Sequence, residues 1–584
     1  SCFGSQWALA IATVAPNRSP RELKREGVLM TFLLLHLGLQ LAVADQARFH
    51  PWHTKPATPD FSLDQFEAKV HTTVGKLLFE DNFENRTLFS GVAGGNQFAT
   101  IWVRDFCHAT GGLLMKPSWK IGTKDVPSKT IVLSTLKEIL SFVKGENGSS
   151  IQIPRALDSL GPHEDLLSFK VLKAGASLKA KVTFPFGNKD PGKGMEKFPS
   201  GKLYAYFNGE DGAKETSDAG YLLILTFTRV VPLLTDAELN EFLTSSGSNL
   251  QKAVDFYSSP HRWEQRDNKW FFNQTAWSEW KDSCKQEGIS SYSNLQLVEA
   301  LTKLIKLMKS NAAVATTLSG AKLFGPRFGS TQPMTLGNTS GYDGLLSQLH
   351  DWTMDIHAHF YDNATGLLRE LDSHGNQELF KISHIDANLQ WLETNDHSEE
   401  ARQLISLDSI SQAFVKRLHD NSGIRTLQGI NAKGWPKSEV SPAKQVIGLY
   451  QYHGHFAWSW WTCWFAEIAA KESNATLAKD LLGFVWRTQY DSSLNQKFSG
   501  YISEVYTNTH IVNTMAYVSE TPFLWGSSYC VRAVEALKHP QAALLQSNKE
   551  AKSPSMMRPR RWSLRSQGKL EQDEDSMALL QSEL

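Results

Sequence analysis

The chain alternates between two kinds of helical pattern, and this alternation constrains its fold more than any other feature. The patterns pair as 101–115 with 129–144, 217–233 with 236–257, 291–310 with 341–360, 384–394 with 398–419, 451–471 with 475–489, and finally 521–538. In most pairs the first segment is aromatic or small and nearly free of charge, which is typical of a buried helix. The second is amphipathic, as in a surface helix. The amphipathic segment 60–80, with Asp60 as a candidate N-cap, then serves as the outer partner of the last buried helix. Six buried helices, each with an outer partner, predict a mainly α fold: an (α/α)6 toroid of six helical hairpins.

Several stretches between these helices are not helical. Residues 145–216 hold alternating runs such as "SLKAKVTFPF" and "KLYAYF" between Gly- and Pro-rich turns, which predicts a small β-rich insertion. The Trp-rich segment 261–290 and the loop 421–450 are long enough to suggest a functional role. We therefore predict one domain over 60–540, followed by a disordered charged tail over 546–584.

The beginning of the chain has the features of a secretory signal. The run "MTFLLLHLGLQLAVADQ" starts at Met30 and ends in Ala42-Val43-Ala44, which fits the apolar region and cleavage site of a signal peptide. Residues 1–44 are therefore predicted to be an upstream segment and a signal peptide, and the protein is expected to be secreted or to stay in the secretory lumen. Sequons that would make it a glycoprotein lie at Asn85, Asn147, Asn273, Asn338, Asn363 and Asn474.

The even number of cysteines after the predicted signal peptide is consistent with an oxidising compartment, but it does not establish which of them form disulfides. Beyond Cys2 there are four, at Cys107, Cys284, Cys463 and Cys530, and they lack metal-binding spacing. They can be bonded or free. Because the first and last inner helices are neighbours in a closed ring, Cys107 and Cys530 are candidates for a disulfide.

Charge and aromatic content narrow the class of partner. Sixty basic and sixty acidic residues cancel, so no global field attracts nucleic acid or an anionic membrane. The 18 Trp residues often stand in polar company, and flat rings beside carboxylates suit a sugar-binding cleft, although buried structural Trp explains many of them. We expect an oligosaccharide or glycan substrate, a monomer, no membrane insertion, no metal and no cofactor.

Each predicted inner helix begins with polar or aromatic residues before it becomes apolar. The six beginnings read "WVRDF" from Trp102, "SDAGYLL" from Ser217, "SSYSNLQ" from Ser290, "SHIDANLQW" from Ser383, "YHGHFAWSWW" from Tyr452 and "SETPFLWG" from Ser519. In a toroid these beginnings meet at one end of the ring and line one pocket.

This arrangement resembles the six-hairpin glycosidases, a superfamily that includes neutral invertases, microbial glucoamylases and the amylo-α-1,6-glucosidase domain of glycogen debranching enzymes. The motifs "QFATIWVRDF", "TSDAGYLLIL" and "GYISEVYTNT" are similar in order and spacing to the family's sugar-gripping, general-acid and second-carboxylate segments. The resemblance implies Asp218 as the general acid and Glu504 as the second carboxylate. It also implies Asp105 as a ligand of sugar hydroxyls and a pocket-lining role for the Trp-rich segment of Trp280 and Asp282. The full set of candidate substrate-binding residues is Trp102, Arg104, Asp105, Trp280, Asp282, Trp435, His453, His455 and Trp525.

The expected activity is hydrolysis of a glycosidic bond in a glycan that contains glucose, by two carboxyl groups and with inversion. One carboxylic acid protonates the leaving oxygen, and the other group activates water across a gap of about 6.5–9.5 Å. Other interpretations remain open for single residues: Asp218 as a helix N-cap, Arg104–Asp105 as a structural ion pair, Glu504 as a solvated loop residue and Asp282 as an alternative acid. Departures at Tyr221-Leu222 and Thr507-Asn508 keep open an inactive sugar-binding protein, and a polysaccharide lyase on the same toroid is a third alternative.

Overall fold

The structure is a computed structural model. The residues that it describes run from 61 to 539, with gaps at 84–85, 95–99, 147, 159–202, 208–214, 282–283, 339–340, 374–379, 381–382, 396–398, 416–436, 441–451, 454–455, 491–500, 507–511 and 513–518. The signal-peptide region, the charged tail and most of the predicted β-rich insertion lie outside these residues. No described helix is both long and apolar enough to cross a bilayer.

Six of the described helices pack side by side in a closed ring. Their order around the ring is α4 (Val103–Leu113), α7 (Ala219–Val230), α9 (Ser291–Ser310), α12 (Ile385–Thr394), α16 (Ser459–Lys471) and α18 (Leu524–Lys538), and α18 packs against α4 again. Nearly all side chains of α7 and α16 are buried, as expected for helices that are apolar on every face.

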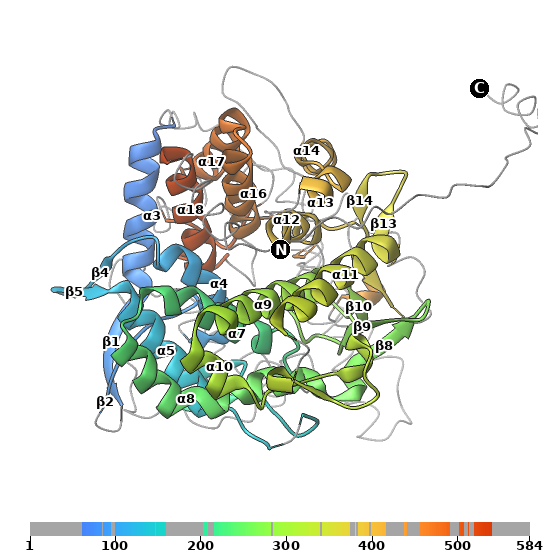
Figure 1. The fold of residues 1–584 in the computed structure, drawn as a ribbon. Coiled ribbons are helices and arrows are strands. Elements are labelled where there is room, and N and C mark those ends of the chain that lie inside the picture. The colour runs from blue at the N-terminus through green and yellow to red at the C-terminus, as the bar shows by residue number, and fades with distance from the viewer. Residues whose placement is uncertain are drawn as a thin grey trace, which may run out of the picture.

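The amphipathic helices lie outside this ring. They are α5 (Ser128–Ser141), α8 (Asp236–Asp255), α10 (Ala312–Leu318), α11 (Tyr342–Phe360), α13 (Glu399–Leu404), α14 (Leu407–Phe414), α17 (Ala475–Tyr490) and α3 (Leu63–Leu77). Figure 1 shows α3, from the N-terminal side of the chain, beside α18 near the C-terminal end, and these two helices are in contact. The first helix thus covers the last inner helix, and the predicted (α/α)6 toroid is confirmed.

Local sequence signals explain where several helices begin. Thr235 and Glu238 form a capping box at α8, and Ser290 accepts a hydrogen bond from the Ser293 amide at α9. At α3 the cap is Ser62, not Asp60 as predicted, because Ser62 stands one residue before the first helical turn.

The ring closes tightly between α4 and α18. A methyl group on Gly112 would lie 2.0 Å from the backbone oxygen of Ser528, so only glycine fits there. The disulfide is Cys463–Cys530, between α16 and α18, whereas Cys107 is free and buried. The candidate pair Cys107–Cys530 was therefore wrong. The last inner helix has two neighbours in the ring, and its cysteine faces α16.

Short antiparallel strands connect the helices, several of them next to the beginnings of inner helices. The sheets are β1 (Leu78–Phe83) with β2 (Arg86–Gly91); β3 (Ile101–Trp102) with β6 (Ala156–Asp158) and β7 (Tyr204–Tyr206); β4 (Ser118–Ile121) with β5 (Lys124–Pro127); β8 (Trp263–Arg266), β9 (Lys269–Gln274), β10 (Gly288–Ser290) and β15 (Leu371–Asp372); β11 (Lys322–Leu323) with β12 (Met334–Thr335); β13 (Tyr361–Asp362) with β14 (Leu367–Leu368); and β16 (Ala457–Trp458) with β17 (Val505–Tyr506). Because β3, β10 and β16 each run directly into an inner helix, their partners fix where α4, α9 and α16 begin.

Several helix boundaries differ from the sequence prediction. The helix predicted over 451–471 begins only at Ser459, because β16 pairs with β17 just before it. The helix predicted over 398–419 is divided into α13 and α14, where Ser406 caps the second helix. Residues 78–80, predicted as the end of the first helix, belong to β1 instead.

Candidate active site

Two predicted site residues meet between the neighbouring inner helices α4 and α7. The Arg104 side chain on α4 donates from Nε to Oδ2 of Asp218 and from a terminal nitrogen to Oδ1 at 3.4 Å. Both residues are buried. Asp218 occupies the N-cap position of α7, but its described side chain makes no capping hydrogen bond. Asp218 therefore does not act as a side-chain cap of α7. Instead it forms an ion pair with Arg104, which lies 114 residues earlier in the chain.

A second segment, residues 275–281, lies against Asp218. The Ser217 amide donates to the Ser278 carbonyl at 2.9 Å, and the two serine hydroxyls are 2.5 Å apart. Trp277 has a φ of 63°, a left-handed conformation that is rare for a bulky residue. Such strain persists only where the surroundings impose it, and it is common at functional sites. The contacts with Ser217 thus hold a strained turn next to Asp218.

This turn presents a carboxyl group that favours its protonated form. Glu279 is almost completely buried, and burial, together with the nearby carboxylates of Glu370, Asp386 and Asp218, raises its pKa from 4.5 to about 8 against the opposing effect of Lys281. Within the described residues, Oε2 of Glu279 has no hydrogen-bond partner. A buried carboxyl group that keeps its proton at neutral pH has the property that a general acid needs.

The predicted second carboxylate is also buried, and it is surrounded by donors. Glu504 lies directly before β17 and is 4% exposed, so it is not a solvated loop residue. The Tyr452 hydroxyl donates to Oε1 at 2.6 Å, and the Glu520 amide donates to Oε2 at 3.4 Å. Hydrogen bonds to both oxygens suit an ionised carboxylate.

Aromatic rings link the two carboxyl groups. Trp280, next to Glu279, packs edge-on against His453 with ring centres 5.2 Å apart, and His453 follows Tyr452 in the chain. Trp280 also packs edge-on against Trp525.

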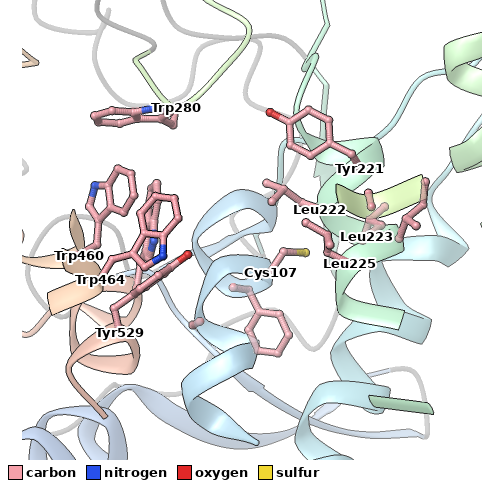
Figure 2. Packing of buried hydrophobic residues seen from close by; sticks show 14 of the residues in the cluster. Cys107, Tyr221, Leu222, Leu223, Leu225, Trp280, Trp460, Trp464 and Tyr529 are labelled. Carbon is pink, nitrogen blue, oxygen red and sulfur yellow. The ribbon is translucent and has the colours of Figure 1, made fainter. Parts of the chain in front are cut away.

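The same group of aromatic rings includes Trp460 and His108. Both stack on Trp525, with ring centres 4.5 Å apart for Trp460 and 4.3 Å apart for His108. Figure 2 shows Trp280 above the rings of α16 and α18, with Cys107 of α4 between this group and the apolar side chains of α7. The helix beginnings therefore converge at one end of the ring, as predicted.

The remaining predicted substrate-binding residues fall into two groups. Trp102 ends β3 and lies beneath Arg155, whose guanidinium carbon is 5.6 Å from the ring centre, and Asp105 is half-buried in the first turn of α4. Asp282, Trp435 and His455 lie outside the described residues. Their roles stay predictions.

Three residues near this end of the ring offer ligand atoms within 4.8 Å of one another: Glu370, His384 and Asp386. The buried ammonium of Lys281 lies 2.8 Å from Glu370 Oε1 and 2.7 Å from Asp386 Oδ2. Burial lowers the pKa of His384, and Lys281 lowers it further. The lysine supplies the positive charge at this cluster, and a divalent ion beside it would face a like charge.

Sequence reasoning did not single out Glu279, Lys281, Glu370, Asp386 or Tyr452. Glu279 and Lys281 lie in the quoted run "WSEWKDS", and Asp386 lies in "SHIDANLQW". The signal that could have pointed to these residues was a Glu and a Lys two positions apart in a Trp-rich loop before an inner helix. Their burial was not readable, because the chain around them has no hydrophobic periodicity.

Comparison with known proteins finds likeness only in structure. No protein-family model matches the sequence, and no curated protein matches it. The solved structures that match include a glucoamylase from Saccharomycopsis fibuligera, 11% identical over 85% of this chain and 99% of its own, with a TM-score of 0.46. A glycosidase in complex with glucose is 10% identical over 82% and 98%, with a TM-score of 0.43. A rhamnosidase from Klebsiella oxytoca with rhamnose bound is 10% identical over 84% and 66%, with a TM-score of 0.42.

Proposed function

We propose that this protein is a glycoside hydrolase in which Glu279 donates the proton to the leaving oxygen and Glu504 is the second carboxylate. One observation supports this above all others: two buried carboxyl groups of opposite character lie at the same end of the ring. The pKa of Glu279 is raised to about 8, whereas Glu504 is held by donors on both oxygens. Glycoside hydrolysis needs this combination of one protonated and one ionised carboxyl group.

The proposal moves the acid from Asp218, the sequence-based candidate, to Glu279. Both oxygens of Asp218 are engaged by Arg104 in a charge-assisted contact, which a donor to the leaving oxygen would have to give up. In this scheme Asp218 keeps its ion pair with Arg104 beside the donor. There it stabilises the positive charge that develops on the sugar ring as the bond breaks.

The proposed reaction uses the two groups together. Glu279 transfers its proton to the glycosidic oxygen as the carbon–oxygen bond breaks. Glu504 removes a proton from the water that attacks the opposite face of the sugar, with the Tyr452 hydroxyl orienting its carboxylate. We propose inversion, a glucose-containing substrate and Asp105 as a ligand of sugar hydroxyls, all by resemblance at the sequence motifs.

We also propose that the protein is a monomer of the secretory pathway. The apolar run from Met30 supports this location, and so does the Cys463–Cys530 disulfide, because structural disulfides are typical of oxidising compartments.

The test is hydrolysis of a panel of glucosides, fructosides and mannosides by wild type, E279Q, D218N and E504Q. E279Q is expected to lose about 10²–10⁴-fold in kcat on alkyl glycosides. It should keep most of its activity on glycosyl fluorides, because fluoride needs little protonation to leave. E504Q should lose both activities. The exposed outer-helix variant E241Q is the matched control.

Two results would contradict the proposal. If D218N, and not E279Q, shows the leaving-group dependence, the acid is Asp218. If all variants and the wild type bind glycans without turnover, the protein is a lectin. Proton NMR of the first-formed anomer decides between inversion and retention.

A further inference from the structure

Lys281 joins three chain segments inside the protein. Its ammonium has no solvent exposure and lies 2.8 Å from Glu370, just before β15, and 2.7 Å from Asp386, in the first turn of α12. It is also 3.7 Å from Oε1 of Glu279, two residues earlier in its own segment. This buried cation therefore helps to fix the strained segment 275–281 to the ring.

The partners of Lys281 are themselves held in place. Oδ2 of Asp386 also accepts the indole N–H of Trp280 at 2.7 Å, and Oδ1 accepts the Ala387 amide at 2.9 Å. Oε1 of Glu370 also accepts from the Gln286 side chain at 3.3 Å. The positions of the two carboxylates around Lys281 are thus set by several independent bonds.

The balance of charge in this cluster bears on Glu279. One ammonium faces two carboxylates, which leaves a net negative charge next to a third carboxyl group in a region without solvent. Ionising Glu279 would add a second uncompensated charge, which like charges and burial both oppose. Burial pushes the pKa of Lys281 down, but Asp386, Glu279 and Glu370 outweigh it and hold the pKa above its ordinary value, so the ammonium stays charged.

The groups that face Glu279 and Lys281 come from several elements. They are Asp218, paired with Arg104 of α4; Tyr221 of α7; Tyr292 of α9; Glu370; and His384 and Asp386 at the beginning of α12.

We propose that Lys281 is a positioning residue that, through Glu370 and Asp386, places Glu279 and sets the charge around its carboxyl group. The inference rests on the proposed function, in which Glu279 is the proton donor. The inference predicts that two kinds of variant shift the ionisation of Glu279 in opposite directions. Removing a carboxylate, in D386N or E370Q, favours ionisation of Glu279, whereas removing the cation, in K281Q, opposes it.

The experiment measures the protonation of Glu279 in two ways. The carbonyl stretch of its protonated carboxyl group is followed by infrared difference spectroscopy across pH and assigned by its loss in E279Q. In parallel, kcat/KM is measured against pH. In D386N and E370Q both the infrared midpoint and the alkaline limb are expected to move to lower pH by about one unit or more, a tenfold loss of kcat/KM above the limb.

K281Q is expected to move the midpoint to higher pH. If it does not fold, D386N and E370Q still decide the matter. K124Q, which removes a mostly exposed lysine paired with Glu80, is the control and should leave the midpoint unchanged.

Folded D386N and E370Q proteins whose infrared midpoints equal that of wild type would overturn the inference. A shifted infrared midpoint in a protein that hydrolyses no glycoside would support the role of Lys281 and refute the proposed function, so the two failures are distinguishable.

Discussion

Replacing Glu279 with Gln should stabilise the folded protein at neutral and alkaline pH. Gln has the shape of the protonated acid but cannot ionise. In the wild type the pKa of Glu279 is raised from 4.5 to about 8, mainly because the group is buried. A difference of about 3.5 pH units corresponds to about 5 kcal/mol, at ~1.4 kcal/mol per unit.

The direction follows from proton linkage. Below pH 4.5 both the folded and the unfolded chain bind this proton, and the free energy of unfolding does not depend on it. Between pH 4.5 and 8 the unfolded chain loses the proton while the folded chain keeps it, so the wild type loses stability as pH rises. E279Q lacks this loss. Its advantage should grow by about 1.4 kcal/mol per pH unit and reach about 3 kcal/mol at pH 7.

The assay is urea unfolding of wild type and E279Q at several pH values between 4.5 and 8. The quantity of interest is the slope of the difference against pH, because a constant offset from the new amide cancels. E241Q, on the exposed face of α8, should show a flat difference. An E279Q difference that is equally flat would refute the raised pKa, and with it the argument for Glu279 as the acid.

Three further outcomes are expected. G112A should lower the free energy of unfolding by about 1–3 kcal/mol, because its methyl group would collide with the Ser528 carbonyl between α4 and α18, and an unchanged melting temperature would contradict this close approach. Y452F removes the 2.6 Å hydrogen bond to Glu504 and should lower kcat about tenfold or more with little change in KM, so a pure KM effect would argue against an orienting role. Asn363 is exposed in the turn between β13 and β14, and protein from a secretory host should therefore have a glycan there that N363Q removes, as judged by intact mass; equal masses would count against it.

The ring itself was predictable because its signal is local. Fully apolar segments such as α7 and amphipathic ones such as α8 differ within a few turns, and their alternation requires the first kind to be enclosed by the second. The end at which the site lies was predictable too, since polar and aromatic residues gather at the beginnings of the inner helices. The predicted contribution of Asp218 and Glu504 to this end came from the resemblance at the sequence motifs and not from that pattern.

The pairings at this end were not predictable in the same way. Nothing local indicates that Arg104 contacts Asp218, and this ion pair depends on how α4 and α7 pack. The same holds for the disulfide of Cys530. Both neighbours of α18 in the ring, α4 and α16, contain a cysteine, and only the packing decides which one bonds to Cys530.

The amino-acid sequence by itself therefore determined the helical toroid, its buried and exposed faces and the end where polar groups collect. These properties follow from hydrophobic periodicity along each segment. Only the tertiary structure decided which carboxyl group keeps its proton. The pKa of Glu279 depends on burial and on Lys281, Glu370 and Asp386, and two of these come from segments about 90 and 105 residues further along the chain. Electrostatic energy depends on distance and dielectric in the folded state, and neither can be read from spacing in a sequence.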